Sequence, residues 1–271
     1  MNWVWKSLSE LPSQSDGLVI GFFDMCGSQP MTTGRTWVQT DGFPKLPMSE
    51  PLKVVRRLYS GCAPMYISYA PGLSLTLLQQ KIYKPILKGM GLSDDAAHIG
   101  ASAGAGFGTG MAWVNMCDRM MILQQMSARE GLQTPLLQVV KQTLSREGVR
   151  GLTRGALPTS IRESAYATLV LAGPTVKRAI FSKENLQQYP WSTTVLASGL
   201  LGFGGASATN LADVWKTNVQ ARHYTPSSTP KLSPWEKGVD FVKTIKRVGN
   251  GSFAKGAFRG SGFRGLGYTW S

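Results

Sequence analysis

Charged residues are absent from three long stretches of the chain, residues 58–80, 96–117 and 185–212. Each stretch is long enough to cross the roughly 30 Å hydrocarbon layer of a membrane as a helix. Each is also rich in glycine, alanine, serine and threonine, the small residues that let membrane helices approach closely. The pattern therefore predicts three membrane-spanning helices.

Two further segments are candidate spans with polar residues in or beside them. Residues 17–34 contain Asp24, and the shorter stretch 164–176 follows the pair Arg162 and Glu163. Ionisable residues at membrane depth usually face the interior of a helix bundle or water. We therefore expect several helices arranged around a polar centre.

One ten-residue unit occurs three times in the chain. The copies are PMTTGRTWVQ at 30–39, MCDRMMILQQ at 116–125 and LADVWKTNVQ at 211–220, and each ends in glutamine. In the third copy Asp213, Lys216 and Gln220 share one helix face, because their spacings are three and four. The chain is thus predicted to be built from three repeats.

Two other elements follow each copy. Residues 49–61, 134–148 and 233–249 place apolar residues at helical spacing among lysines and arginines, which predicts amphipathic helices at a membrane surface. The alternative for any one of them is the solvated face of a soluble helix. The next apolar segment then begins with a basic residue and a glycine, at 152–166 and 253–268 and in a weaker form at 58–71. The N-terminus of such a helix attracts phosphate.

Composition changes this picture little. The 271 residues carry a formal net charge of +14, which also suits a glycine-rich soluble helical protein or a soluble nucleic-acid binder. The basic residues, however, cluster between the apolar stretches, so we expect no nucleic-acid partner. Neither the cysteines (Cys26, Cys62, Cys117) nor the histidines (His98, His223) have metal-site spacing, so we expect no metal, and no catalytic constellation indicates an enzyme. The first 16 residues do not look like a cleaved targeting peptide.

The repeated motifs resemble those of the mitochondrial carrier family. Its pattern is P-x-[DE]-x-x-[KR]-x-x-x-Q, followed by EG and [KR]G steps; LADVWKTNVQ fits all but its first position, and EGVRGLTRGALPTSIRE at 147–163 fits closely. The resemblance implies an all-α membrane protein, a three-fold pseudo-symmetric six-helix bundle with amphipathic helices in the matrix. It implies one domain, 1–271, with repeats at about 12–90, 91–184 and 185–271. The sixth helix looks truncated, since about fifteen residues from Gly256 reach little over 20 Å.

In the family, acids and bases of the three odd-numbered helices form a matrix gate of ion pairs. The matching acid positions hold Thr32, Asp118 and Asp213, and the base positions hold Arg35, Met121 and Lys216. In the family each base pairs with the acid of the next repeat, which here makes only Arg35 and Asp118 a complete pair. Asp213 and Lys216 are left unmatched by this rule, although they could pair with each other as near neighbours on one helix. Three glutamines match the braces beneath the gate: Gln39, Gln125 and Gln220. The kinking proline is present only as Pro30, so straighter second and third odd helices are expected.

The resemblance also implies binding positions on the even-numbered helices. Those for substrate are Ser68, Tyr69, Arg162, Glu163, Phe263 and Arg264, and those for an acidic phospholipid such as cardiolipin are Arg154, Gly155, Lys255 and Gly256. An internal ion pair is an equally good explanation of Arg162 and Glu163. No other cofactor is implied.

Two functions remain open, both in the mitochondrial inner membrane with several spans. The favoured one is a non-transporting structural subunit of a larger complex, of the respiratory chain or ATP synthase type, with membrane lipids and other subunits as partners. The alternative is an active carrier of a small anionic or amino-acid-like metabolite, and only then would the chain have a small-molecule substrate.

Overall fold

The computed structural model describes residues 14–40, 42–171, 178, 180–182, 187–221 and 234–261, and these residues form helices and connecting turns with no strand. The elements that make up the bundle are α2 (Gln14–Thr40), α4 (Cys62–Gly89), α5 (Asp94–Thr109), η1 (Gly110–Val114), α6 (Asn115–Arg129), α9 (Ala156–Leu171) and α12 (Pro190–Ala221). The other described helices are α3 (Pro51–Leu58), α7 (Leu136–Glu147), α8 (Val149–Leu152), α13 (Pro234–Val248) and α14 (Phe253–Ala257). The prediction of an all-α fold is therefore confirmed for the described residues.

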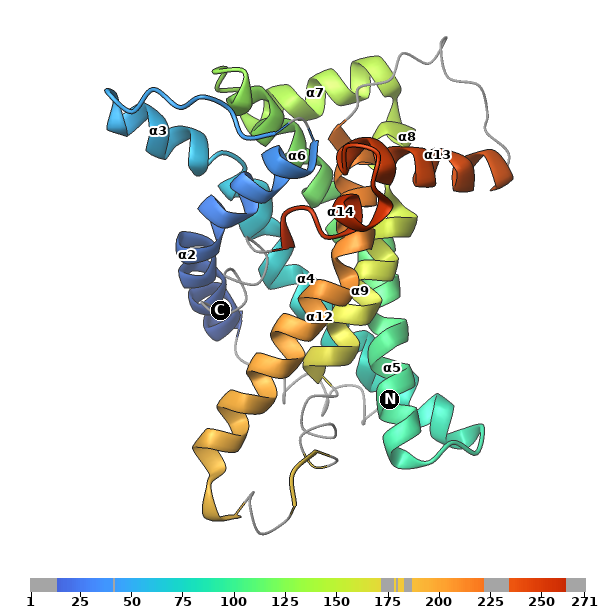
Figure 1. Ribbon diagram of the computed structural model, residues 1–271. Helices are drawn as coiled ribbons and strands as arrows, with labels where there is room; N and C mark the ends of the chain where they lie inside the picture. Colours follow the sequence, from blue (N-terminus) through green and yellow to red (C-terminus); the bar gives the residue numbers. More distant parts are fainter. Residues whose placement is uncertain are drawn as a thin grey trace.

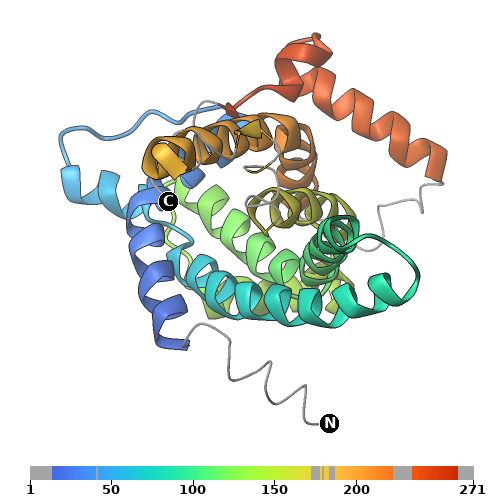
Figure 2. The ribbon, with the colours of Figure 1, turned by 90° about the horizontal axis from the view of Figure 1, so that it is seen from below.

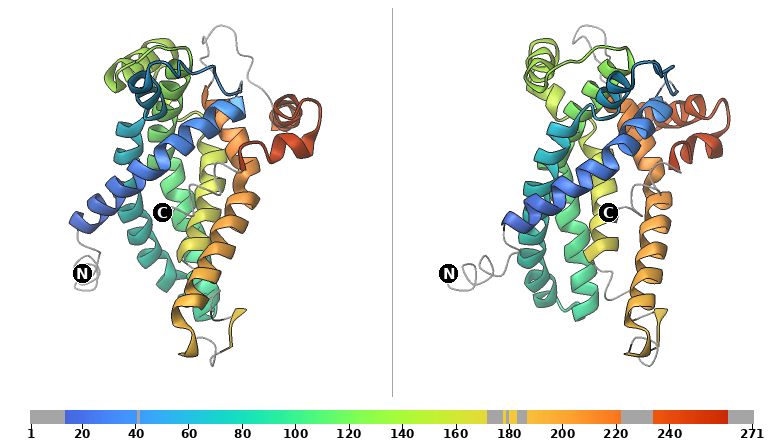
Figure 3. Two further views of the ribbon diagram at one scale, coloured as in Figure 1. Left: turned by 60° about the vertical axis from the view of Figure 1, so that its left-hand side comes forward. Right: turned by 90° about the vertical axis from the view of Figure 1, so that its left-hand side faces the viewer.

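The long helices run beside one another around a common axis, as the view along the bundle shows (Figure 2). Helices α3, α7 and α13 lie at one end of this bundle, across the ends of the long helices (Figure 1). We call this the gate end. Both side views show the same arrangement (Figure 3).

The three uncharged stretches are mainly helical in the structure. Residues 58–80 fall mainly in α4, residues 96–117 in α5, η1 and the start of α6, and residues 185–212 mainly in α12. Within the described parts of the chain, no helix is both long enough and apolar enough to cross a membrane. The six membrane segments are thus not confirmed. The truncation of the last one, expected from Gly256 on, falls mainly on residues 262–271, which lie outside the described residues.

The second odd-numbered helix is irregular without a proline. Its continuous course through α5 and α6 includes a π-helical turn at Gly110–Val114. Such turns widen a helix locally and are a known cause of bends. In the third repeat, α12 is one α-helix from Pro190 to Ala221. The expectation that both helices are straighter than the first stays a prediction.

Two of the three amphipathic helices pack on the bundle through small apolar clusters. Val139 of α7 is buried against Met120 and Leu123 of α6. Ile245 and Val248 of α13 are buried with Val214 of α12. Helix α3, by contrast, has no buried residue.

Close packing between α5 and α9 depends on small side chains. A Cβ atom at Gly106 would overlap the carbonyl oxygen of Glu163 in α9. This contact places the backbone of α9 directly against α5, and it brings Arg162 and Glu163 to the centre of the bundle. The boundaries proposed for the three repeats stay a prediction.

Candidate functional site: a buried ion cluster between four helices

Six charged side chains gather near the gate end of the bundle. They are Arg35 of α2, Asp118 of α6, Arg162 and Glu163 of α9, and Asp213 and Lys216 of α12. We call them the central ion cluster. Three are cations and three are carboxylates, so the cluster has no net charge when every group is ionised.

Two ion pairs link α12 to the other odd-numbered helices, α2 and α6. Arg35 Nη1 lies 3.0 Å from Asp213 Oδ2. Lys216 Nζ lies 2.7 Å from Asp118 Oδ2, and the Lys216 side chain is only 1% exposed. The cluster therefore fastens α2 and α6 to α12.

These partners differ from the pairing expected from the sequence. Arg35 was expected to pair with Asp118 of the next repeat, but it pairs with Asp213 of the third repeat. Likewise Lys216, expected to be unmatched, pairs with Asp118. Each base thus meets the acid of the preceding repeat in the ring, and both acids have a base.

This direction of pairing explains the two uncharged positions. The remaining pair would join the base position of repeat 2 to the acid position of repeat 1, which hold Met121 and Thr32. Both members of one pair are therefore replaced together, and each charge of the central ion cluster has a partner of opposite sign. An unpartnered buried charge would cost about 3 to 5 kcal/mol, and this pairing avoids that cost within the cluster.

Arg162 completes the cluster from α9. Its Nη2 atom lies 2.9 Å from Asp118 Oδ2, and its Nη1 atom lies 3.4 Å from Asp213 Oδ1. It also pairs with the neighbouring Glu163. A residue expected at a substrate site thus contacts both acids of the predicted gate.

The three predicted glutamine braces make a cyclic set of contacts, each reaching the neighbouring odd helix. The Gln39 Oε1 atom accepts from Thr217 Oγ1 of α12 at 3.0 Å, and Gln220 Nε2 donates to Asn115 Oδ1 of α6 at 2.8 Å. Gln125 Oε1 accepts from Thr36 Oγ1 of α2 at 2.6 Å. Together they join α2 to α12, α12 to α6 and α6 to α2.

The seam between α2 and α6 is held by hydrogen bonds around Gln125. Gln125 Nε2 donates to Thr33 Oγ1 at 3.2 Å, and the backbone oxygen of Gln125 accepts from Trp37 Nε1 at 2.7 Å. Thr32 and Met121, the two uncharged gate positions, belong to these same two helices.

A second buried ion pair was missed by the sequence interpretation. Arg119, which is fully buried, donates to both Glu147 carboxylate oxygens at 2.7 and 2.8 Å and to the backbone oxygen of Gln220 at 3.3 Å. Arg154 lies 3.5 Å from the same carboxylate. The one available signal was the EG motif at Glu147 and Gly148, which does not point to Arg119. This pair ties α6 to α7 and α12.

The proposed lipid positions shift in the third repeat. Gly61, Gly155 and Gly260 have left-handed backbones, with φ of 86°, 79° and 81°, and each directly precedes helix at Cys62, Ala156 and Ser261. Arg259-Gly260 is thus the structural counterpart of Arg154-Gly155. Lys255 and Gly256, chosen from the sequence, lie inside α14 instead.

The other predicted substrate positions are only partly described. Ser68 is buried and Tyr69 is 38% exposed, both on α4. Phe263 and Arg264 lie outside the described residues. Among the described side chains, no group of histidine, cysteine and acidic residues could hold a metal ion.

Comparison with known proteins bears on the same part of the chain. Residues 95–184 match the family model described as mitochondrial carrier protein. This stretch covers nearly all of the second predicted repeat, from the first turn of α5 through α9. No curated protein matches the chain. This part of the chain, residues 95–184, is therefore similar to the mitochondrial carrier family.

Proposed function

We propose that this chain is a carrier-fold protein of the mitochondrial inner membrane that serves as a structural subunit of a larger membrane complex and does not transport a solute. The observation that carries the proposal is the position of Arg162. This arginine, the cation best placed to grip an anionic substrate, is bound to Asp118 and Asp213.

Releasing Arg162 to a substrate has a clear cost. Its side chain is 13% exposed, and the carboxylates that it contacts are 9% and 0% exposed. Removing a partner from a buried charge typically costs about 3 to 5 kcal/mol. A substrate carboxylate would replace one charge-assisted bond by a similar one, so it supplies little net free energy for opening the bundle. The arginine therefore suits a permanent internal tie.

A second candidate is an active carrier for a small anionic or amino-acid-like metabolite. The observation that favours it is the matched pairing of the central ion cluster, which is neutral and has two complete pairs across α12. In the closed state of such a gate, both charges on α12 have a partner on a neighbouring helix. The Arg162–Glu163 pair could then contact the two ends of a zwitterion.

Native electrophoresis of mitochondria in mild detergent tests the proposal. With an antibody against this chain, we expect it to migrate with a complex many times its own mass of 29.4 kDa. Purified chain in proteoliposomes should show no saturable uptake of amino acids or dicarboxylates. A monomer band together with uptake that Arg162→Gln abolishes would refute the structural role and establish the carrier.

A further inference from the structure

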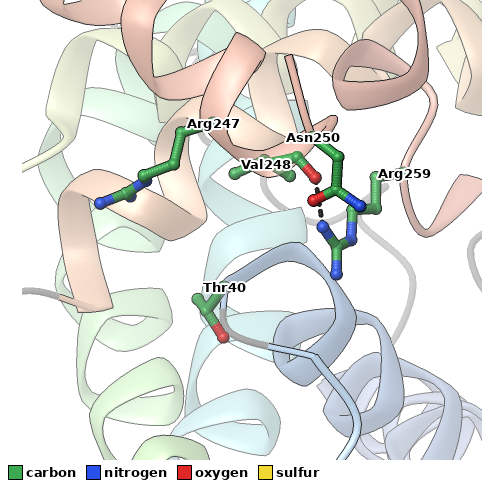
Figure 4. A pocket seen from close by; sticks show the side chains of 5 residues that line it. All are labelled: Thr40, Arg247, Val248, Asn250 and Arg259. Carbon is green, nitrogen blue, oxygen red and sulfur yellow. Dashed lines mark hydrogen bonds between the residues drawn. The ribbon is translucent and has the colours of Figure 1, made fainter. Parts of the chain in front are cut away.

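The three helices that lie across the gate end are held to the bundle to different degrees. Helix α13 is fastened at its end, because Arg259 Nη1 donates to the backbone oxygen of Val248, the last residue of α13 (Figure 4). Helix α7 is fastened at its end by the pair of Glu147 with Arg119 of α6. Helix α3 has no buried residue, and it projects beyond the ring of long helices in the view along the bundle (Figure 2).

One face of α3 carries an exposed apolar stripe. Leu52 is 81% exposed, Val55 is 50% exposed and Tyr59, the residue at which the helix ends, is 37% exposed. These three residues follow one another at spacings of three and four, so they lie on one side of the helix. Helices that bind in an apolar groove of another protein use anchors at this spacing.

The stripe faces away from the bundle. A Cβ atom at Gly131 would lie only 2.8 Å from Arg57 Nη2, so the Arg57 side chain lies against the turn that follows α6. Arg57 is two positions after Val55, which places it about 200° further around the helix, nearly opposite the stripe. Helices α7 and α13 have the reverse orientation, since Val139 and Ile245 point their apolar side chains into the bundle.

The basic residues of α3 set the charge that a partner must have. The helix contains Lys53, Arg56 and Arg57 and no acidic residue. Lys53 pairs with Glu50 at the surface and Arg57 is turned toward α6, whereas Arg56 follows Leu52 by four positions and is a neighbour of the stripe. A carboxylate of a partner can pair with such a guanidinium through two parallel hydrogen bonds. The net charge of +14 on the whole chain also favours an acidic partner.

A protein groove fits this surface better than a membrane. Recognition of anionic lipids usually takes a cluster of about four to eight lysines and arginines. Next to the stripe α3 has Arg56, while Lys53 is already paired. The helix is also only eight residues long, whereas helices that lie in a membrane interface often have about 20 to 30 residues. This surface therefore differs from the membrane contact that the sequence suggests for residues 49–61.

We propose that the apolar stripe of α3 binds in an apolar groove of another protein subunit, and that a carboxylate on the rim of this groove pairs with Arg56. The inference rests on the structural role proposed above and names the surface that performs it. Leu52 and Val55 are the main anchors, because they are the most exposed apolar side chains of the stripe and burying apolar surface drives association.

Native electrophoresis tests the stripe in mitochondria where a variant replaces the original chain. Leu52→Ser/Val55→Ser should reduce the fraction of the chain that migrates with the complex several-fold. Leu137→Ser is the matched control, because Leu137 of α7 is 82% exposed, and it should migrate as the original chain does. Since Leu52 and Val55 are exposed, the purified double variant should keep the original Tm, which separates lost binding from unfolding.

Charge reversal and cross-linking test the chemistry of the partner. Arg56→Glu should also weaken migration with the complex, whereas Arg146→Glu, at an exposed arginine of α7, should not. Leu52→p-benzoylphenylalanine should form an adduct with one protein subunit of the complex under ultraviolet light. An adduct with lipid alone would overturn the proposal in favour of a membrane surface.

Failure of this inference can be told from failure of the structural role. A monomer band from the original chain would refute the structural role and the α3 contact with it. If the original chain and Leu52→Ser/Val55→Ser migrate equally with the complex, only the α3 contact is overturned and the structural role stands.

Discussion

Replacing Lys216 with methionine tests the pairing in the central ion cluster most directly. The substitution leaves the three carboxylates of the cluster with two cations. Asp118, whose Oδ2 atom lies 2.7 Å from Lys216 Nζ, loses its nearest partner but keeps Arg162 at 2.9 Å. Breaking a buried pair costs about 3 to 5 kcal/mol, and the remaining arginine favours the lower end, about 3 kcal/mol.

This free energy translates into a measurable shift. At about 2 to 4 °C per kcal/mol for a chain of this size, Lys216→Met should lower the apparent Tm by about 6 to 12 °C. The measurement is tryptophan fluorescence during heating at one fixed rate in mild detergent. Lys53→Met is the control, because Lys53 is exposed and its pair with Glu50 lies at the surface. Such a pair contributes at most about 1 kcal/mol.

The double variant Asp118→Asn/Lys216→Met supplies the decisive comparison. It restores a neutral cluster of Arg35, Arg162, Glu163 and Asp213, so it should recover at least half of the lost stability. A double variant whose loss equals the sum of the two single losses would show that the two residues do not interact and would refute the pairing. A Tm for Lys216→Met within 2 °C of the original protein, on the order of 1 kcal/mol or less, would do the same.

Two other sets of substitutions test the geometry of the gate end. Thr32→Asp and Met121→Lys should each destabilise the chain by about 3 kcal/mol, because each places an unpartnered charge in the bundle. The double variant rebuilds the third pair and should recover most of this loss in the same thermal assay, whereas additive losses would show that the two positions do not meet. Gly155→Ala should lower the Tm more than Gly91→Ala, since both residues have positive φ but only a Cβ at Gly155 would come within 2.8 Å of the Gln220 side chain. Equal Tm losses would contradict this tight contact.

Residue type and spacing predicted which side chains take part in contacts between the helices, but they did not predict the partner of each side chain. The glutamines at 39, 125 and 220 recur in register, and each reaches a neighbouring odd helix. The partner of Arg35 was predicted wrongly because a repeat pattern carries no information about the direction in which adjacent repeats contact one another. That direction depends on how the helices are arranged around the bundle axis, which only the structure provides.

The third repeat shows a second limit of the sequence. The segment FAKGAFRG contains two steps of a basic residue followed by glycine, and spacing alone does not decide between them. The backbone decides, because Gly260 has the positive φ of Gly61 and Gly155 whereas Gly256 lies within α14. Arg119 and Glu147 were missed for a related reason: 28 residues separate them, and no local pattern links them.

Because Thr32 and Met121 are both uncharged, the contact between α2 and α6 differs from the contacts of α12 with these two helices. Separating α12 from α2 or from α6 pulls opposite charges apart, as the pairs at 3.0 and 2.7 Å require. Separating α2 from α6 at the Gln125 contacts breaks neutral hydrogen bonds, each with a net worth of about 1 kcal/mol. We therefore expect local opening of the bundle to begin between α2 and α6, because this contact costs the least free energy to break.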